Sequence, residues 1–360
     1  MKTAVIIGLC MAASVFASAA DAPKPFDHGD DADVNKLKQA EKSDVVNPMP
    51  DRPLAKCELK DKIYHGVLLW TDEREGFRQR YDNYVKVAGK KPSMIGTFDC
   101  IWSNGVKQPD NSFEKRLKII DEIPNVIPFM KVYTGDWKPG CPFLSADEIL
   151  DGKHDKYFKN MAGYCKAYGK PMLVSFNHEM NGDWFFYSEL YKKEKTDWTA
   201  EKFIRIWRKI HGIFKDEGVA NVAFVWCPQM TGRPYKELNA QNSFKAYYPG
   251  DEYVDWIGPS FYNDVNHMYM DNLVKTYPSK PIILAEWGTE PNRGQWYVPK
   301  PYPGDAKHME MTLNLFPKKY PNIKAMTYFY WGKDVNIERL PEQVEIYQKG
   351  IANPVFLSNE

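Results

Sequence analysis

Cysteine is scarce in this sequence, and no two cysteines have the spacing of a metal site. Only six occur among 360 residues, and none belongs to a Cys-x-x-Cys pair, so a structural zinc centre is not expected. One of the six, Cys10, lies in a segment that we expect to be removed, and the other five leave at least one thiol unpaired within the chain. Cys100 and Cys141 fall in neighbouring predicted loops, where they could be free or bridged in an oxidising compartment.

A surplus of charge of either sign is also absent. The chain has 48 basic and 47 acidic residues, which gives a formal net charge of +1. Binding to nucleic acid or to an anionic membrane through the field of the whole protein requires a basic surplus. We therefore expect neither partner.

Long apolar runs are missing as well. Residues 5–15 form an apolar run that falls short of a bilayer span, and no other segment is apolar enough to cross a membrane. Lys2 precedes this run and the small residues 17–20 follow it, which is typical of an export signal over residues 1–20. We expect a secreted or periplasmic protein, a monomer, with no membrane span.

Residues 21–58 contain five prolines, an acidic cluster and few large apolar side chains. This composition predicts an extended, partly disordered N-terminal extension. His28 lies beside aspartates, but their spacing fits no calcium loop, and we expect neither a metal nor another cofactor. Residues 59–360 show no internal repeat and no linker, and they are enough for one domain with a sizeable core.

Eight apolar runs of strand length follow one another in residues 59–360, with amphipathic helical patterns between them. The runs are Ile63–Trp70, Met94–Phe98, Val126–Val132, Met172–Phe176, Val222–Trp226, Val254–Phe261, Ile282–Ala285 and Ala325–Tyr330. The helical patterns include Phe113–Ile123, Tyr157–Tyr168, Glu201–Phe214 and Ala306–Phe316, with Ser145 and Thr199 as expected helix starts. Strands that alternate with helices indicate a parallel sheet, and eight of them predict an α/β fold, the (β/α)8 TIM barrel.

One stretch, Pro171–Tyr187, joins an apolar run to a cluster of polar and aromatic residues. The run ends at Phe176, and His178 and Glu179 follow at once. In a parallel barrel, the active site is built at the carboxyl ends of the strands, so these side chains are candidates for catalysis. A glutamate that caps a loop or faces solvent is the plain alternative for Glu179.

A second stretch, Pro281–Pro291, repeats this pattern and places Glu286 after an apolar run. Two carboxylic acids on separate strand ends are what hydrolysis of a glycosidic bond requires, one as proton donor and one as nucleophile or base. Aromatic residues make up 14% of the chain, which suits a protein that stacks sugar rings, although a large core also uses them.

Three motifs together resemble glycoside hydrolase family 26, the family of secreted β-mannanases with some mixed-linkage β-glucanases and β-1,3-xylanases. The resemblance spans roughly residues 60 to 353. Its residues are His178-Glu179-Met180-Asn181-Gly182 with Trp184, Tyr248-Pro249-Gly250-Asp251 leading into Val254-Asp255-Trp256-Ile257-Gly258 and Tyr262, and Ala285-Glu286-Trp287-Gly288.

The resemblance implies roles for individual residues of this chain. Glu179 would be the acid/base and Glu286 the nucleophile, about 5 to 5.5 Å apart as in retaining enzymes. Tyr262 would hydrogen-bond the nucleophile and His178 a sugar hydroxyl, with a core aromatic and a structural histidine as the alternatives. Further residues implied at the cleft, each of which could instead be packing, are Trp184 and Trp331, with Trp137 and Trp287 as weaker candidates.

One segment departs from the pattern of the mannan-cleaving relatives. The third strand ends in Phe129-Met130-Lys131-Val132-Tyr133-Thr134, without the histidine expected there, which weakens the assignment of mannan. Lys131 and Tyr133 could contact substrate hydroxyls, or Lys131 could pair with a barrel carboxylate. A lysine on a barrel strand also permits Schiff-base chemistry, as in aldolases, but that chemistry does not explain the two glutamates.

The sequence thus predicts a secreted, retaining endo-β-glycanase that acts on plant-type polysaccharides or oligosaccharides. Its expected substrate is β-1,4-mannan or galactomannan, with mixed-linkage β-1,3-1,4-glucan or β-1,3-xylan as alternatives. A barrel that binds polysaccharide without cleaving it is the rival from another class of protein.

Overall fold

The computed structural model describes residues 50–71, 74–136, 138–230, 233–262, 265–289, 304–331, 336–339 and 341–359. The predicted export signal and most of the predicted N-terminal extension lie outside these residues. The strands are β1 (Ile63–Leu68), β2 (Met94–Cys100), β3 (Trp102–Ser103), β4 (Val106–Lys107), β5 (Ile127–Tyr133), β6 (Met172–Phe176), β7 (Val222–Trp226), β8 (Trp256–Ile257), β9 (Ser260–Phe261), β10 (Ile282–Trp287), β11 (Ile323–Phe329) and β12 (Phe356–Leu357).

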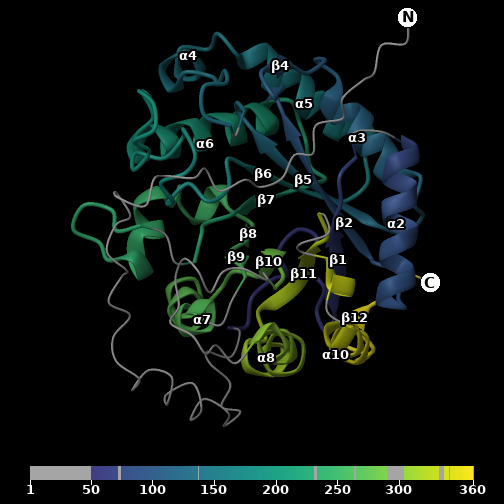
Figure 1. The fold of residues 1–360 in the computed structure, drawn as a ribbon. Helices are drawn as coiled ribbons and strands as arrows, with labels where there is room; N and C mark the ends of the chain where they lie inside the picture. Colours follow the sequence, from purple (N-terminus) through teal and green to yellow (C-terminus); the bar gives the residue numbers. More distant parts are fainter. Residues whose placement is uncertain are drawn as a thin grey trace, which may run out of the picture.

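The helices lie outside the ring of strands (Figure 1). They are α2 (Arg74–Ala88), α3 (Ser112–Asp121), α4 (Ala146–Leu150), α5 (Asp155–Tyr168), α6 (Ala200–Asp216), α7 (Val265–Thr276), α8 (Gly304–Glu310), α9 (Phe316–Lys319) and α10 (Pro341–Ile351). A π-helical segment, Met311–Leu315, joins α8 to α9, and 3-10 helices cover Ala240–Tyr247, Asp251–Tyr253 and Ile337–Arg339. The predicted helix starts Ser145 and Thr199 are confirmed, since each side chain accepts a hydrogen bond from the backbone N–H three residues later.

The main sheet is a closed parallel barrel, as predicted. Its hydrogen-bonded order is β1, β2, β5, β6, β7, β8, β10 and β11, and β11 pairs with both β10 and β1, which closes the ring. The short strand β9 also pairs with β10, β12 adds to β1, and β3 with β4 forms a separate hairpin. The chain therefore has the (β/α)8 fold, in which catalytic groups gather where the strands end.

The eight predicted runs correspond to the barrel strands, and two of them, β6 and β7, have the predicted bounds. The run 254–261 is interrupted, because Gly258 and Pro259 separate β8 from β9. Proline has no N–H for the ladder. A Cβ at Gly258 would lie 2.6 Å from Val225 Cγ1 and 2.8 Å from Cys227 Sγ, so only glycine fits this approach to the neighbouring strand.

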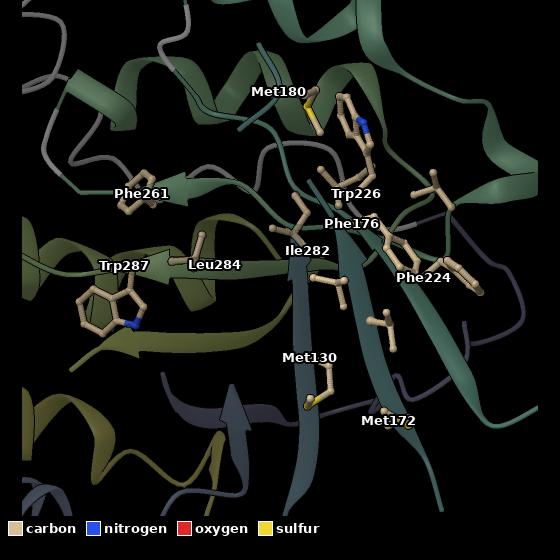
Figure 2. Packing of buried hydrophobic residues seen from close by; sticks show 14 of the residues in the cluster. Met130, Met172, Phe176, Met180, Phe224, Trp226, Phe261, Ile282, Leu284 and Trp287 are labelled. Carbon is tan, nitrogen blue, oxygen red and sulfur yellow. The ribbon is translucent and has the colours of Figure 1, made fainter. Parts of the chain in front are cut away.

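Alternate residues of each strand enter two different apolar clusters. One cluster fills the barrel and includes Phe129, Leu173, Val225 and Ile283, whereas the larger cluster lies between strands and helices. Members of this outer cluster are shown in Figure 2, where they include Met130, Phe176, Trp226, Leu284 and Trp287. This alternation fixes which side chains of β5 and β6 point into the barrel.

Residues just before β1 cover the end of the barrel at which the strands begin. The indole of Trp256 donates to the carbonyl of Lys56 at 2.7 Å, and Cys57 packs against the barrel cluster beside the first residue of β6. The carboxylate of Glu58 is buried and forms a bidentate pair with Arg52. With this end covered, the opposite end remains for a cleft.

The described cysteines are free thiols, so a bridge between Cys100 and Cys141 is not formed. Within the described ranges, no helix is long and apolar enough to span a bilayer.

Candidate active site

Glu179 follows β6 in a backbone turn that is unusual for its residue types. Asn177 has φ 47° and Glu179 has φ 56°, both in the left-handed region that disfavours residues with a Cβ. Neighbouring strands hold this turn in place, because the Asn177 N–H donates to the Val132 carbonyl at 2.8 Å and the Glu179 N–H to the Cys227 carbonyl at 2.6 Å. Such strain is typical of functional sites, and here it directs the Glu179 side chain at the mouth of the barrel.

The loop after Glu179 positions an indole against its carboxylate. The Asn181 side chain anchors the loop by donating to the Gln229 carbonyl and accepting from the Gln229 N–H, both at 2.8 Å. A Cβ at Gly182 would lie 2.3 Å from the Trp184 ring, so the ring requires glycine there. The Trp184 Nε1–H then donates to Glu179 Oε2 at 2.8 Å.

Glu286 points into the barrel because β10 is irregular at its end. Leu284 pairs with Met326 but Trp287 pairs with Tyr328, so three steps along β10 match two along β11. Without this irregularity, strict alternation would place Glu286 on the outer face with Leu284. As a result Trp287 packs outside the barrel against Tyr328, 1% exposed, and it is not a cleft residue.

Three donors surround the Glu286 carboxylate, which is 5% exposed. Lys131 Nζ donates to Oε1, His178 Nε2 lies 3.1 Å from the same oxygen, and the Tyr262 hydroxyl donates to Oε2 at 2.7 Å. Burial by itself would raise the pKa of Glu286, but the Lys131 ammonium and the His178 ring outweigh burial and hold this pKa well below its usual range. These neighbours therefore favour the ionised form of Glu286.

The two glutamates lie close together. One side-chain oxygen each of Glu179 and Glu286 and a ring nitrogen of His178 all lie within 4.8 Å of one another. Carboxyl groups of inverting glycosidases are about 6.5 to 9.5 Å apart, whereas those of retaining enzymes are about 5 to 5.5 Å apart.

The side chains of His178, Glu179 and Glu286 are of types that can also bind a metal ion. However, Lys131 already supplies a positive charge beside Glu286, which disfavours a second cation there.

His178 is held within aromatic rings. Its ring centroid lies 5.6 Å from that of Phe98 and 5.3 Å from that of Phe185, and its Nε2 is 3.3 Å from the Tyr133 hydroxyl. The His178 carbonyl accepts from the Tyr187 hydroxyl at 2.7 Å. The edge of the His178 ring faces Glu286, which agrees with a contact between His178 and a sugar hydroxyl. That contact stays a prediction.

Trp331 belongs to an aromatic group at the ends of β1, β2 and β11. It is partly exposed, meets Trp70 and Phe98 edge-on with centroid distances of 4.5 and 5.0 Å, and stacks on Phe329 at 5.4 Å and 12°. A fixed, partly open indole at this end of the barrel is suited to stack a sugar ring.

Every predicted site residue that the structure describes, apart from Trp287, therefore lies at this end of the barrel. Trp137 falls outside the described residues, as does Glu290, the next glutamate along the chain after Glu286. Phe98 and Trp70 were missed as site residues because they end ordinary apolar runs. The structure agrees with one of the predicted roles of Lys131, namely that it pairs with a barrel carboxylate.

A family comparison indicates which group of barrel proteins the chain resembles. Residues 153–299 match the model of glycosyl hydrolase family 26, a span that includes Glu179, Tyr262 and Glu286. Over this span, the chain is similar to glycosyl hydrolase family 26.

Curated relatives of this chain are distant, and each match covers only part of either sequence. Endoglucanase H of Acetivibrio thermocellus is 27% identical over 57% of the chain and 23% of the relative. A mannan endo-1,4-beta-mannosidase of Bacillus subtilis strain 168 is 24% identical over 46% of the chain and 40% of the relative. The chain thus spans less than half the length of these relatives.

Solved structures of family 26 proteins share the fold. The structure of GH26A from Muricauda sp. MAR_2010_75 has a TM-score of 0.57 at 19% identity, covering 83% of this chain and 92% of that one. The catalytic domain of the Bacillus sp. JAMB-750 GH26 endo-beta-1,4-mannanase has a TM-score of 0.58 at 17% identity, covering 82% and 87%. At such identities, these similarities establish the barrel alone.

Proposed function

We propose that this chain is a retaining endo-β-glycanase that cleaves its substrate by a double displacement with Glu286 as nucleophile and Glu179 as acid/base. The observation that carries the proposal is the short separation of the two carboxylates, within 4.8 Å between their nearer oxygens. This separation leaves no room for the water that an inverting enzyme places between sugar and base.

In the first step, a Glu286 oxygen attacks the anomeric carbon while the bond to the leaving sugar breaks. The leaving oxygen takes the proton of Glu179, so the products are a glycosyl ester on Glu286 and a shortened glycan. In the second step, Glu179, now a carboxylate, removes a proton from water, and the hydroxide oxygen displaces Glu286. Both steps invert the anomeric carbon, so the configuration is retained overall.

The surroundings of the two glutamates support this assignment of roles. The cationic Lys131 and the Tyr262 hydroxyl stabilise a negative charge on Glu286, as a nucleophile requires. Glu179 contacts no lysine or arginine among the described residues, and the indole of Trp184 orients it.

The substrate that we propose is β-1,4-mannan or galactomannan, a plant-type polysaccharide. The mannosidase name of the Bacillus subtilis relative favours mannan. The axial 2-hydroxyl of mannose hinders approach to the anomeric carbon and calls for a hydrogen-bond partner near the nucleophile. His178, 3.1 Å from Glu286 Oε1, is placed to be that partner.

Mixed-linkage β-1,3-1,4-glucan is the second candidate, with β-1,3-xylan as a further alternative within the family. Two observations favour glucan. The third barrel strand ends in Phe129–Thr134 without the histidine that is expected of the mannan-cleaving relatives. The relative whose match covers 57% of the chain is named an endoglucanase.

A panel of polysaccharides tests this proposal. We expect reducing sugar to be released fastest from carob galactomannan, more slowly from barley β-glucan and least from β-1,3-xylan, with mixed oligosaccharides as early products. Faster cleavage of β-glucan than of galactomannan would overturn the mannan assignment. Retention on insoluble glycan without any release would favour the non-catalytic barrel, and release of only one short product would argue against endo action.

The first twenty residues support a further part of the proposal, the location of the enzyme. We place the enzyme outside the cytoplasm, either secreted or in a periplasm, and expect it to act as a monomer on dissolved or solid glycan.

A further inference from the structure

Lys131 is a charged side chain inside the barrel to which the double displacement assigns no step. Its side chain is 1% exposed and lies on the inner face of β5, two residues after Phe129. The ammonium is 4.9 Å from the centroid of the Phe98 ring and donates to Glu286 Oε1. A buried ammonium is costly unless it is paired, so Lys131 and Glu286 depend on each other.

Several titratable groups besides Lys131 face Glu286, and most of them stay neutral. Burial raises the pKa of the Tyr133 and Tyr187 phenols well above their usual value and that of the Cys227 thiol to about 12. The other facing groups are Tyr262, which donates to Oε2, His178, and Glu179, whose carboxylate adds negative charge. The groups that can place positive charge beside Glu286 are therefore Lys131 and His178.

We infer that Lys131 is a positioning residue that keeps Glu286 ionised and aimed, and that its charge sets the acid limit of activity. The inference rests on the proposed role of Glu286 as nucleophile. Lys131 and His178 hold Oε1 and Tyr262 holds Oε2, so donors on three elements fix the plane of the carboxylate. Without the ammonium, burial would favour the protonated, non-nucleophilic form of Glu286.

The test removes the charge of Lys131 but keeps the approximate shape of its side chain. Lys131→Met is nearly isosteric, and Lys131→Gln keeps a hydrogen-bond donor without charge in case the methionine variant does not fold. Lys118→Met is the matched control, because Lys118 is 72% exposed and its partner among the described residues is Glu114 on the outer helix α3. The profile of kcat/KM against pH is measured for all of them.

We expect the acid limb of this profile to move to higher pH by about one unit or more in both Lys131 variants, and to stay in place in Lys118→Met. The sign follows because loss of a neighbouring cation raises the pKa of a carboxyl group. The variants should therefore lose about 10-fold more activity on the acid limb than at neutral pH. A rise in KM with an unmoved acid limb would overturn the inference and make Lys131 a substrate contact.

Thermal unfolding at several pH values gives a second reading that does not depend on turnover. The pKa of Glu286 is lower in the folded protein than in the unfolded chain. This difference stabilises the folded protein at pH values above the unfolded pKa, and the stabilisation is lost as the pH falls through the folded pKa. The Tm difference between the wild type and Lys131→Met should thus be largest near neutral pH and narrow on acidification. A difference that is constant with pH would overturn the inference in favour of simple packing.

The pH profile of kcat/KM and the dependence of Tm on pH also distinguish a failure of this inference from a failure of the proposed function. If Glu286→Ala kept its activity, the proposed function would fail while the dependence of Tm on pH still reported the coupling of Lys131 to Glu286. If Glu286→Ala were inactive but the acid limb of Lys131→Met did not move, the inference about Lys131 alone would fail.

Discussion

Replacement of Glu286 by alanine is expected to abolish hydrolysis of every glycan that the enzyme cleaves. No covalent intermediate can form without the attacking carboxylate, and no other described carboxylate except Glu179 lies within the same cluster. A single positioned acid or base contributes typically 10²- to 10⁴-fold to the rate, and we expect the loss here to reach or exceed about 10⁴-fold. This corresponds to about 5.5 kcal/mol of transition-state stabilisation.

Two controls separate this loss from damage to the fold. Glu286→Gln keeps the shape of the side chain and an acceptor for Tyr262, so it should remain folded and be as inactive as Glu286→Ala. Glu345→Ala removes an exposed glutamate that pairs with Lys349 on α10, and it should keep full activity. Full activity in Glu286→Ala would show that another residue is the nucleophile, and Glu290 would be the first to test.

Replacement of Glu179 by alanine is expected to have an effect that depends on the leaving group. Hydrolysis of polysaccharide should fall by about 10²- to 10⁴-fold, because the leaving sugar no longer receives a proton. An aryl β-glycoside with an activated leaving group needs no proton to depart, so its first step should survive. Water is then no longer activated by a base, and the glycosyl-enzyme should accumulate after a rapid burst of the aryl group.

Azide distinguishes the two glutamates by the configuration of the product. In Glu179→Ala, azide needs no base and should attack the glycosyl ester of Glu286, giving a β-glycosyl azide and faster turnover. In Glu286→Ala, azide can occupy the space of the lost carboxylate and attack the activated substrate directly, which gives the α-azide. If the two anomers appeared with the opposite variants, the assigned roles would have to be exchanged.

The barrel itself was predictable because its strands are covered on both faces. A run such as Met172–Phe176 is apolar except for Ser175, since its alternate side chains enter the barrel cluster and the outer cluster. The two glutamates could be found because each follows such a run directly. Their common end of the barrel then follows from parallel strands.

The orientation of Glu286 was not predictable in the same way. It depends on the irregular pairing of β10 with β11, which turns Glu286 inward and Trp287 outward, and a single sequence does not carry the register of two strands. For the same reason, Trp287 was a cleft candidate by its place in the sequence but packs outside the barrel.

The partner of Lys131 and the aromatic group around Trp331 were equally hidden in the sequence. Lys131 lies 155 positions before Glu286, and several carboxylates could have met it. Trp70 and Phe98 end runs that are read as core, and only the closed ring of strands brings them beside Trp331. Contacts between distant segments depend on the closure of the barrel, which the local pattern of each segment does not encode.

The most direct test of the account is the site of the covalent adduct in Glu179→Ala. The variant is incubated with a 2,4-dinitrophenyl β-mannobioside, quenched in acid, digested and analysed by mass spectrometry with fragmentation of the peptide that spans residues 281–291. We expect one mannobiosyl group per chain, attached to Glu286. A burst without any adduct, or an adduct on Glu290, would contradict the role of Glu286 as nucleophile.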